Sequence, residues 1–342
     1  MSTTPALALA MPTTHEQWLA LGVSKTVYSL PYPQVRAHLA TVAAHVESRL
    51  ARHDNPWEKK QDAMHDGLRA AWLTYAAKAQ FQLGSHLTHF YPTAGASEAI
   101  RETIATIGAR DSKQTSYQRP GIAIFEGEYE GYEAIALGLG MRVMKIPRAQ
   151  WKSGLERAWD EGYDFFLSQP SAIDGNYWNE YSEFLAFAND VGGRVHLDVS
   201  YVGACERIVP ISSQSPAIKS VFFSLSKPLG VYYRRIGGCF TAEANPLLYG
   251  NMWFKNLDSI ADGEALLQEF DPGEMPRAWA HARKMAIERL EKEHGWNLTP
   301  CDVFLLAQGR GPGLAELARL PGGSARVCIT PSIARAIEEL QR

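Results

Sequence analysis

The sequence predicts an α/β protein with a mainly parallel central sheet covered by helices on both faces. Two observations carry this prediction: short apolar runs, and amphipathic stretches that alternate with them from about residue 90 to residue 241. Such alternation is typical of strand–helix units whose strands are buried on both faces. The predicted strands are residues 121–125, 142–146, 164–168, 194–198, 220–224 and 236–241. Helical spacing lies between some of them, at residues 132–139 and 182–189.

Helical spacing also flanks this region. Residues 33–51 and 60–80 precede it. Residues 275–293 follow it and are expected to form one long helix, because Pro276 suits a first turn and Gly295 suits a helix end. A short strand at 326–329 and a helix at 332–341 close the chain.

These patterns divide the chain into three predicted parts. Residues 1–59 form an N-terminal arm and helix, residues 60–250 a large domain, and residues 251–342 a small C-terminal α+β domain with an interdomain helix. A chain of 342 residues is long enough for two such cores. The first 12 residues are mildly apolar but lack the basic region of a signal peptide and the length of a membrane span. We expect them to form a loosely packed arm.

The composition is that of an ordinary globular protein, with 46% hydrophobic and 21% charged residues. A formal net charge of -3 gives no electrostatic reason to expect nucleic acid or an anionic membrane as partner. The four cysteines lie far apart and form no Cys-x-x-Cys pair, so we expect neither a disulfide framework nor a metal site. A reducing cytoplasm is the compartment that suits such a chain.

One lysine has an unusual setting. Lys227 follows a predicted strand in a loop of small residues, Ser224-Leu225-Ser226-Lys227-Pro228-Leu229-Gly230. Taken alone, a lysine at a strand end is more often an ordinary surface residue. However, Arg235 follows it by eight residues, and Asp198 ends another apolar strand 29 residues before it. These companions at fixed distances favour a functional interpretation.

The pattern resembles the fold-type I enzymes that depend on pyridoxal phosphate (PLP), specifically the class I/II aminotransferase superfamily. The residues that match the lysine segment of that family are Ser224, Lys227, Gly230, Arg235 and Gly237. Asp198-Val199-Ser200-Tyr201 is similar to its Asp-x-x-Tyr strand end, and Gly95-Ala96-Ser97-Glu98 to its phosphate turn, with serine where many members have aspartate. Tyr129-Glu130-Gly131-Tyr132 looks like the segment of the ring-stacking aromatic, and Arg326 like a late arginine that opens a strand.

The resemblance assigns roles that the chemistry of the residues supports. Lysine is the side chain that forms an imine, so Lys227 would be the Schiff-base residue that holds PLP and, once displaced, moves the α-proton of the substrate. The carboxylate of Asp198 would keep the pyridine nitrogen protonated. Tyr201 could donate a hydrogen bond to the phenolic oxygen of the ring. A strand-end cap is the ordinary alternative for Asp198, and a half-buried loop tyrosine is the alternative for Tyr201.

The phosphate of PLP needs donors and positive charge. Gly95, Ala96 and Ser97 precede a predicted helix at 98–107, so their N–H groups would lie at its N-terminus. Ser97 also fits a plain N-cap, and the two roles are compatible.

The other end of the phosphate site is predicted near Lys227. Ser224 and Ser226 offer hydroxyl groups, and Arg235 offers a planar guanidinium. Arg234 competes with Arg235, but alternation along a strand lets only one of the two face inward. The spacing of the family favours Arg235.

Two further contacts are expected. Tyr129 would stack on the pyridine ring, with Tyr132 as the alternative. Arg326 would receive the α-carboxylate of an amino acid as a bidentate pair. Arg310 and Arg319 compete with it, although neither opens an apolar strand segment.

The chain departs from the family in one motif. Most members carry Asn-Pro-x-Asn-Pro-x-Gly, whereas this chain has Gln169-Pro170-Ser171-Ala172-Ile173-Asp174-Gly175. Ala172 stands where the family has an asparagine that contacts the ring oxygen. Ser171 or Asn176 substitutes for that asparagine, or Tyr201 acts alone.

Three functions follow, in order of preference. The first is an aminotransferase that moves an amino group between an amino acid and a 2-oxo acid. The second is another PLP reaction on the same fold, such as elimination, decarboxylation, cyclisation or oxidation, which the missing asparagine favours. The third is a non-catalytic sensor, but the N-terminus lacks the basic charge of a DNA-binding segment. The resemblance also implies a homodimer with the active site at its interface.

Overall fold

The computed structural model describes residues 14–51, 60–111, 121–252 and 256–342. They form two compact units. The larger comprises Ser29–Ala278 and Asp302–Phe304, and the smaller comprises Trp279–Cys301, Leu305–Arg342 and the described part of Met1–Tyr28. The arm predicted for residues 1–12 lies outside the described residues.

A seven-stranded sheet is the centre of the larger unit. Its strands, in spatial order, are β2 (His89–Thr93), β9 (Gly237–Thr241), β8 (Ile218–Ser224), β6 (Val195–Asp198), β5 (Asp164–Ser168), β3 (Gly121–Phe125) and β4 (Arg142–Ile146). Only β9 runs antiparallel to its neighbours β2 and β8. The remaining pairs are parallel, which confirms the predicted mainly parallel sheet.

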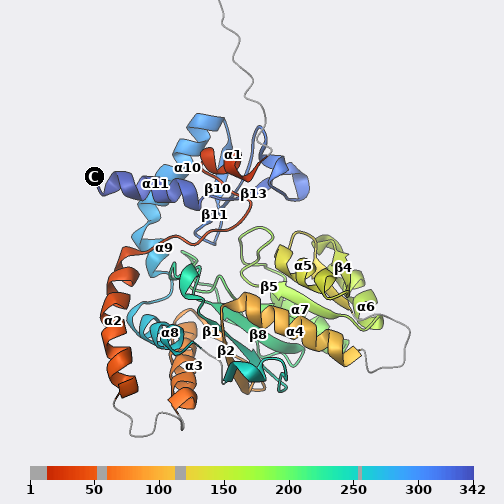
Figure 1. Ribbon diagram of the computed structural model, residues 1–342. Helices are drawn as coiled ribbons and strands as arrows, with labels where there is room; N and C mark the ends of the chain where they lie inside the picture. The colour runs from red at the N-terminus through yellow and green to blue at the C-terminus, as the bar shows by residue number, and fades with distance from the viewer. Residues whose placement is uncertain (1–13, 52–59, 112–120, 253–255) are drawn as a thin grey trace, which may run out of the picture. The chain divides into compact units, whose positions relative to one another are not determined.

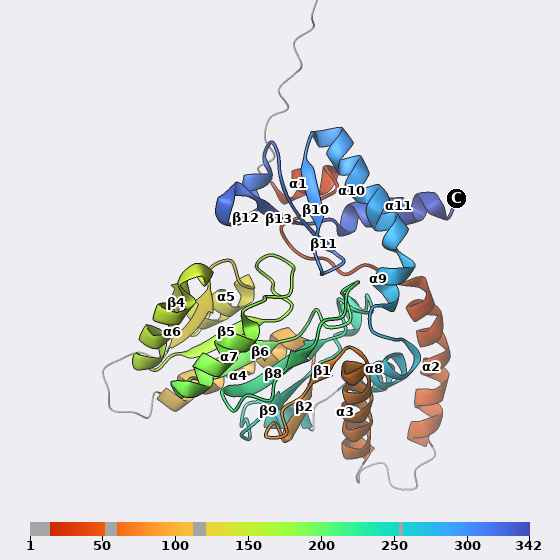
Figure 2. The same ribbon diagram turned by 180° about the vertical axis from the view of Figure 1, so that it is seen from behind.

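Helices cover both faces of this sheet, as Figures 1 and 2 show from opposite sides. On one face, α4 (Ala96–Asp111) and α5 (Glu130–Gly138) pack on Ile124, Phe166 and Phe222. On the other face lie α3 (Lys60–Lys78), α6 (Trp151–Asp160) and α7 (Tyr181–Asp190). There, Trp72 of α3 stacks on Phe223 with the ring centroids 4.4 Å apart. The neighbours Phe222 and Phe223 thus point to opposite faces, as the pleat of a strand requires.

Two predictions about the organisation of the chain need correction. Because α8 (Leu257–Glu269) packs against α3 and α2 (Pro33–Ala51), it belongs to the larger unit and not to a C-terminal domain that begins at residue 251. The helix expected at 275–293 is two helices, α9 (Glu274–Ala278) and α10 (Ala280–His294). Between them Trp279 has φ −109° and ψ 15°, so the backbone leaves the helical conformation although the residue pattern continues.

The smaller unit contains an antiparallel four-stranded sheet in the order β10 (Asn297–Pro300), β11 (Leu306–Arg310), β13 (Ala325–Cys328) and β12 (Ala318–Arg319). It also contains α1 (His15–Ala20) and α11 (Thr330–Leu340), and α11 packs against α10. N-terminal and C-terminal segments meet in this unit, since Ser24 bridges to Cys328. Of these strands the sequence predicted only the last, β13.

The remaining elements are short. They are β1 (Phe81–Gln82), β7 (Ile211–Ser212), η1 (Arg148–Gln150), η2 (Tyr232–Arg234), η3 (Tyr249–Met252), η4 (Leu314–Glu316) and η5 (Pro321–Gly323). Within the four described stretches, no helix is both long enough and apolar enough to cross a membrane.

Candidate cofactor site

Most of the residues singled out by the sequence lie at one edge of the large sheet. Ser168 at the end of β5 is level with Asp198 at the end of β6. Gly237 at the start of β9 is level with both Ser224, which ends β8, and Thr93, which ends β2.

The carboxyl ends of parallel strands are where α/β folds bind ligands. The turns that carry Gly95, Tyr129, Tyr201 and Lys227 all follow strands that end at this edge.

Close backbone contact forms a corner between β2, β8 and β9. A Cβ atom added to Gly237 would lie 2.7 Å from Cα of Gly95 and 2.5 Å from the carbonyl oxygen of Phe223. Gly95 itself has φ +81°, which favours glycine. A Cβ atom added to Gly95 would lie 3.0 Å from Nη2 of Arg235 and 3.6 Å from Oγ of Ser224. Only glycine at both positions therefore lets the guanidinium and the hydroxyl approach the loop this closely.

The N-terminus of α4 opens onto the same corner. The helix begins at Ala96, not at Glu98 as predicted, so Ser97 lies inside the first turn and is not the N-cap. Glu98 turns back and accepts a hydrogen bond from the N–H group of Ala94. The first N–H groups of a helix have no partner within the helix and carry partial positive charge. The corner thus combines a helix N-terminus with an arginine and suits an anion.

Arg234 and Arg235 diverge before β9. Arg235 donates from Nη2 to the carbonyl oxygen of Ala94 at 2.7 Å, and its guanidinium lies 5.2 Å from the ring centre of Tyr232. Arg234 instead forms an ion pair with Asp262 at 3.2 Å. Strand alternation is not the reason, because both residues precede the strand. Arg235 has φ +52°, and this left-handed residue turns the chain between the two side chains.

The turn after β8 carries Ser226 and Lys227. The hydroxyl of Ser224 accepts a hydrogen bond from the N–H group of Ser226 at 3.2 Å and lies 3.1 Å from its hydroxyl. Lys227 follows and is half-buried. Gly230 ends the turn with φ +68°, where an added Cβ atom would lie 2.1 Å from the carbonyl oxygen of Leu30. The turn is thus held by its own hydroxyl contacts and by the packed segment at Leu30.

Asp198 is a buried carboxyl group held by neutral donors. It accepts hydrogen bonds from the hydroxyl of Tyr132 at 3.1 Å and from the N–H group of Ser200 at 2.9 Å. Burial raises the pKa of Asp198 above its usual value, and these hydrogen bonds only partly oppose that rise. Among the described residues no lysine, arginine or histidine forms an ion pair with it. A cationic group brought to this position would find a carboxylate without a counterion.

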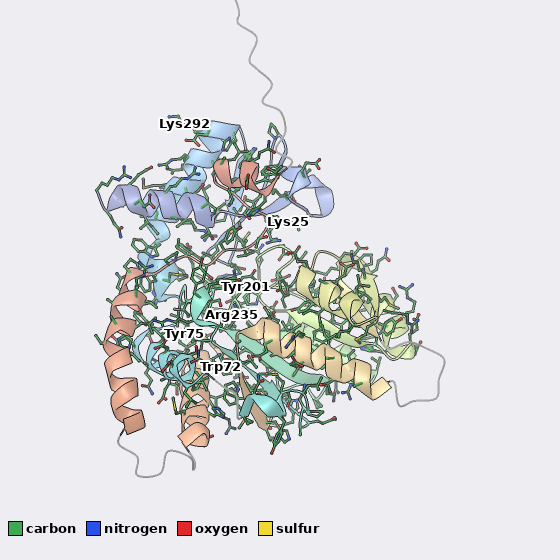
Figure 3. The ribbon with its side chains drawn as sticks, viewed as in Figure 1. Lys25, Trp72, Tyr75, Tyr201, Arg235 and Lys292 are labelled. Atoms are coloured by element: carbon green, nitrogen blue, oxygen red, sulfur yellow. The ribbon has the colours of Figure 1, made fainter. Side chains whose placement is uncertain are left out.

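The tyrosine pair at the start of α5 is divided between two environments. Tyr132 is fully buried and its hydroxyl donates a hydrogen bond to Asp198, whereas Tyr129 is 37% exposed. Their rings meet edge to face with centroids 5.4 Å apart. Tyr129 is therefore the one of the pair that a ligand can reach. Figure 3 labels Tyr201, which is partly buried in the turn after β6, and Arg235 before β9.

The segment that departs from the family motif is held by its own contacts. The N–H group of Ala172 donates to the hydroxyl of Ser168 at 2.7 Å, and Ser171 accepts a hydrogen bond from Arg148. The side-chain oxygen of Asn176 accepts from the N–H group of Asp302 at 2.8 Å. Both residues considered as replacements for the missing asparagine thus have structural partners.

Sequence reasoning missed Glu128. This carboxyl group is 8% exposed and accepts hydrogen bonds from Ser168 and from the N–H group of Tyr129. Burial raises the pKa of Glu128 to about 7, against the opposing effect of these hydrogen bonds. Its position directly before Tyr129 was the only available signal, because its partner Ser168 lies 40 residues away in the sequence.

Arg326 lies in the smaller unit. It is the second residue of β13, level with Gln308 of β11 and Ala318 of β12. Its Nε atom is buried and has no hydrogen-bond partner among the described residues. The competitor Arg310 ends β11 and donates to the carbonyl oxygen of Gly322 at 2.8 Å. The side chain of Arg319 lies outside the described residues.

No protein-family model and no curated protein sequence matches this chain. Solved structures do match it along nearly its whole length. Histidinol-phosphate aminotransferase from Sinorhizobium meliloti, in complex with pyridoxal-5'-phosphate, has a TM-score of 0.63 at 15% identity, and the match covers 99% of each chain. YbdL from Escherichia coli, which has a methionine aminotransferase function, has a TM-score of 0.66 at 14% identity over 98% of this chain and 100% of its own.

A third similar structure is a PLP-bound C–S lyase from Staphylococcus hominis, with a TM-score of 0.64 at 12% identity over 98% of this chain and 91% of its own. The chain therefore has the fold of fold-type I PLP-dependent enzymes, which is the fold that the sequence resemblance predicted. At such low identity the similarity defines the fold alone. The chemistry depends on the residues at the sheet edge.

Proposed function

We propose that this protein is a PLP-dependent aminotransferase that acts on an amino acid and a 2-oxo acid. The observation that carries the proposal is Asp198, a buried carboxyl group that has only neutral donors and lies at the ligand-binding edge of the sheet. The pyridine nitrogen of PLP is a group that a carboxylate can hold in its protonated, cationic form. The fold and the neighbouring residues fit the rest of the cofactor.

The phosphate group would lie in the corner between β2, β8 and β9. Gly95, Ala96 and Ser97 offer N–H groups at the start of α4, and Arg235 offers a guanidinium that is already oriented by Ala94. Ser224 and Ser226 would add hydroxyl donors. Helix N-termini and arginine are both common phosphate-binding groups.

Lys227 would hold the cofactor covalently. It lies in the turn after Ser224, at the same edge as Asp198. Once bound, PLP supplies an electron sink that stabilises a carbanion next to its imine carbon. The amine of Lys227 would then carry the proton to and from the α-carbon of the substrate, while Asp198 holds the proton on the ring nitrogen. Tyr201 would donate to the ring oxygen, and Tyr129 would cover one face of the ring.

Arg326 would bind the α-carboxylate of the substrate. Its buried Nε atom without a partner supports this role, because an unsatisfied buried donor is costly unless a ligand completes it. On the resemblance alone, we also propose a homodimer with the active site at its interface. The four cysteines are free, buried thiols, which suits the reducing cytoplasm that we expect.

A second candidate is a PLP enzyme of the same fold that catalyses elimination or another carbanion reaction. Ala172 favours it, because neither Ser171 nor Asn176 is free to take over the contact of the family's asparagine. The similarity to a C–S lyase shows that the same fold is found with lyase chemistry.

Reconstitution with PLP followed by borohydride reduction and peptide mapping tests the covalent claim. The label is expected on Lys227, and Lys227→Ala should lose it together with the visible absorbance band. Lys219→Ala, a change on the preceding strand, is the matched control and should retain both. A label on another lysine would refute the assignment.

A panel of single amino acids then separates the two candidate functions. An aminotransferase should leave the cofactor as pyridoxamine phosphate after one donor, with no second substrate present. A lyase should return PLP unchanged and release a cleaved product. Analysis of the cofactor after protein denaturation distinguishes these outcomes.

A further inference from the structure

Glu128 is a buried carboxyl group to which the proposed cofactor chemistry assigns no task. Gly127, with φ +82°, turns the chain after β3 so that Glu128 points inward while Glu126 stays exposed. One carboxyl oxygen accepts from the N–H group of Ser168 at 3.1 Å, and the other accepts from the N–H group of Tyr129 at 3.1 Å. The hydroxyl of Ser168 lies 2.9 Å and 2.7 Å from the two oxygens. The carboxyl group therefore connects the start of α5 to the end of β5.

Ser168 extends this connection to the next segment, since its hydroxyl also accepts the N–H group of Ala172 at 2.7 Å. Tyr129 is the proposed ring-stacking residue, and Ala172 replaces the asparagine of the family motif. Glu128 contacts both segments through backbone N–H groups or through Ser168. It can thus fix their positions whatever side chains they carry.

The surroundings of Glu128 make its charge sensitive to pH. Burial raises its pKa to about 7, while hydrogen bonds from Ser168 and Tyr129 and the positive charge of Arg148 oppose the rise. Arg148 is itself paired with Asp174 at 3.0 Å. The hydroxyl of Tyr132 donates to Asp198, and burial together with the charges of Asp198 and Glu128 raises the pKa of Tyr132. An ionised carboxylate only accepts hydrogen bonds, so the donors of Ser168 and Tyr129 match the charged form. A protonated carboxyl group would turn one of its oxygens into a donor, although the N–H groups of Ser168 and Tyr129 can only donate.

We propose that Glu128 is a positioning residue whose ionised form holds Tyr129 and the Ser168–Ala172 segment in place for the cofactor. The inference rests on the proposed function, because it assumes that PLP binds at this edge. Cofactor affinity then depends on pH through Glu128, in addition to any dependence that PLP brings itself.

Comparison of Glu128→Gln with Glu126→Gln tests this role. Glu126 is two residues away on the same loop and is exposed, so its variant controls for the loss of one negative charge. The apparent Kd for PLP is measured by absorbance at about pH 6 and about pH 8.5, on either side of the pKa. At the lower pH, the Kd of Glu128→Gln should be about equal to that of the unmodified protein. At the higher pH it should be about three- to tenfold larger, because the ionised carboxylate forms charge-assisted hydrogen bonds that are roughly twice as strong as neutral ones.

Two outcomes would overturn the role of Glu128. One is a ratio of the two Kd values that is the same at both pH values, which is what a residue with a purely structural role would give. The other is a Glu126→Gln variant with the same pH-dependent loss. If Glu128→Gln does not fold, Ser168→Ala removes the hydroxyl contacts and keeps the N–H group; it should show the same direction of effect, and a flat ratio would again overturn the proposal.

Unfolding of the cofactor-free protein separates this proposal from the proposed function. Glu128 has a folded-state pKa above its unfolded value, so its contribution to stability is complete below about pH 4.3 and is lost as pH rises to about 7. The stability of Glu128→Gln should fall less over this range. A fall parallel to that of the unmodified protein would show that Glu128 does not titrate there. Failure of PLP to bind at any pH would refute the proposed function and leave this titration as an independent result.

Discussion

Two buried aspartates at opposite ends of adjacent strands differ in how their charge is balanced. Asp164 begins β5, and its Oδ2 atom lies 3.1 Å from Nε of Arg194 and 3.0 Å from Nε2 of His196. His196 also lies 2.7 Å from the hydroxyl of Ser220. Asp198 ends β6, and its partners Tyr132 and Ser200 are neutral. The protein supplies an arginine and a histidine to the carboxyl group at one end of the sheet, and among its described residues it supplies only neutral donors at the other.

The difference indicates which carboxyl group serves the fold and which serves a ligand. A buried carboxylate is expensive unless it is paired, so a well-paired one is stable without help from outside. A buried carboxyl group with neutral donors alone has a raised pKa, and such groups cluster at functional sites. We therefore propose that Asp164 serves stability and that Asp198 serves the proposed cofactor.

The largest effect is expected for Asp198→Asn, which keeps the shape of the side chain and removes its charge. Apparent affinity for PLP should fall about 150- to 5,000-fold, because loss of one partner of a buried ion pair costs about 3–5 kcal/mol. Stability of the cofactor-free protein at neutral pH should not fall, because no cation is left unpaired. Spectroscopic titration and urea unfolding measure the two quantities. Loss of stability with normal affinity would reverse the assignment.

Asp164→Asn should show the opposite pattern. Its removal leaves His196 and Arg194 without their carboxylate, and we expect a loss of about 2–4 kcal/mol in the free energy of unfolding. Arg194 is partly exposed, which places the value toward the lower end. Affinity for PLP in the folded protein should stay within about twofold, since Asp164 lies at the far end of its strand. Urea unfolding at one pH is sufficient to detect the change.

Arg326→Ala is expected to affect the substrate and not the cofactor. KM for the amino acid should rise about 10- to 100-fold, because hydrogen bonds to charged groups contribute about 1.5–3 kcal/mol. The spectrum of the bound cofactor should be retained. Arg310→Ala is a suitable control, since Arg310 is exposed on the neighbouring strand and binds Gly322. An unchanged KM would remove Arg326 from the substrate site.

The smallest effect is a pH dependence that Asp198 gives to the cofactor-free protein. Burial raises the pKa of Asp198, so the folded state keeps its proton at pH values where the unfolded state, with a pKa of about 3.9, has lost it. Stability from this group is complete below that value and is lost as pH rises through the folded-state pKa. Asp198→Asn should flatten this part of the stability profile, measured by thermal unfolding. Equal profiles would show that Asp198 is ionised in the folded protein without a cost.

The strands and the residues that follow them could be predicted from sequence because both depend on local pattern. Apolar runs located β3, β5, β6 and β8, and Asp198 and Lys227 lie directly at or after two of these runs. The predictions that were wrong concern parts of the fold that depend on contacts between residues far apart in the sequence. The boundary predicted at residue 251 was wrong because α8 packs on α3 in the larger unit. Strands β10 and β11 were missed because their local sequence patterns are weak.

The same distinction applies within the site. Tyr129 and Tyr132 could not be separated by sequence, because the hydrogen bond from Tyr132 to Asp198 joins residues 66 positions apart. Glu128 went unnoticed for the same reason, since its partner is on another strand. Arg235 was preferred over Arg234 because of the family spacing. The two side chains diverge because Arg235 itself has a left-handed backbone conformation, which the sequence pattern does not predict.

The most direct test compares PLP with an analogue that has carbon in place of the ring nitrogen. Apparent Kd values for both compounds are measured on the unmodified protein and on Asp198→Asn. If Asp198 pairs with the protonated nitrogen, the unmodified protein should prefer PLP by about 150-fold or more, the strength of a buried charge pair, and Asp198→Asn should lose most of that preference. The same preference in both proteins would contradict the assignment of Asp198 as the partner of the ring nitrogen.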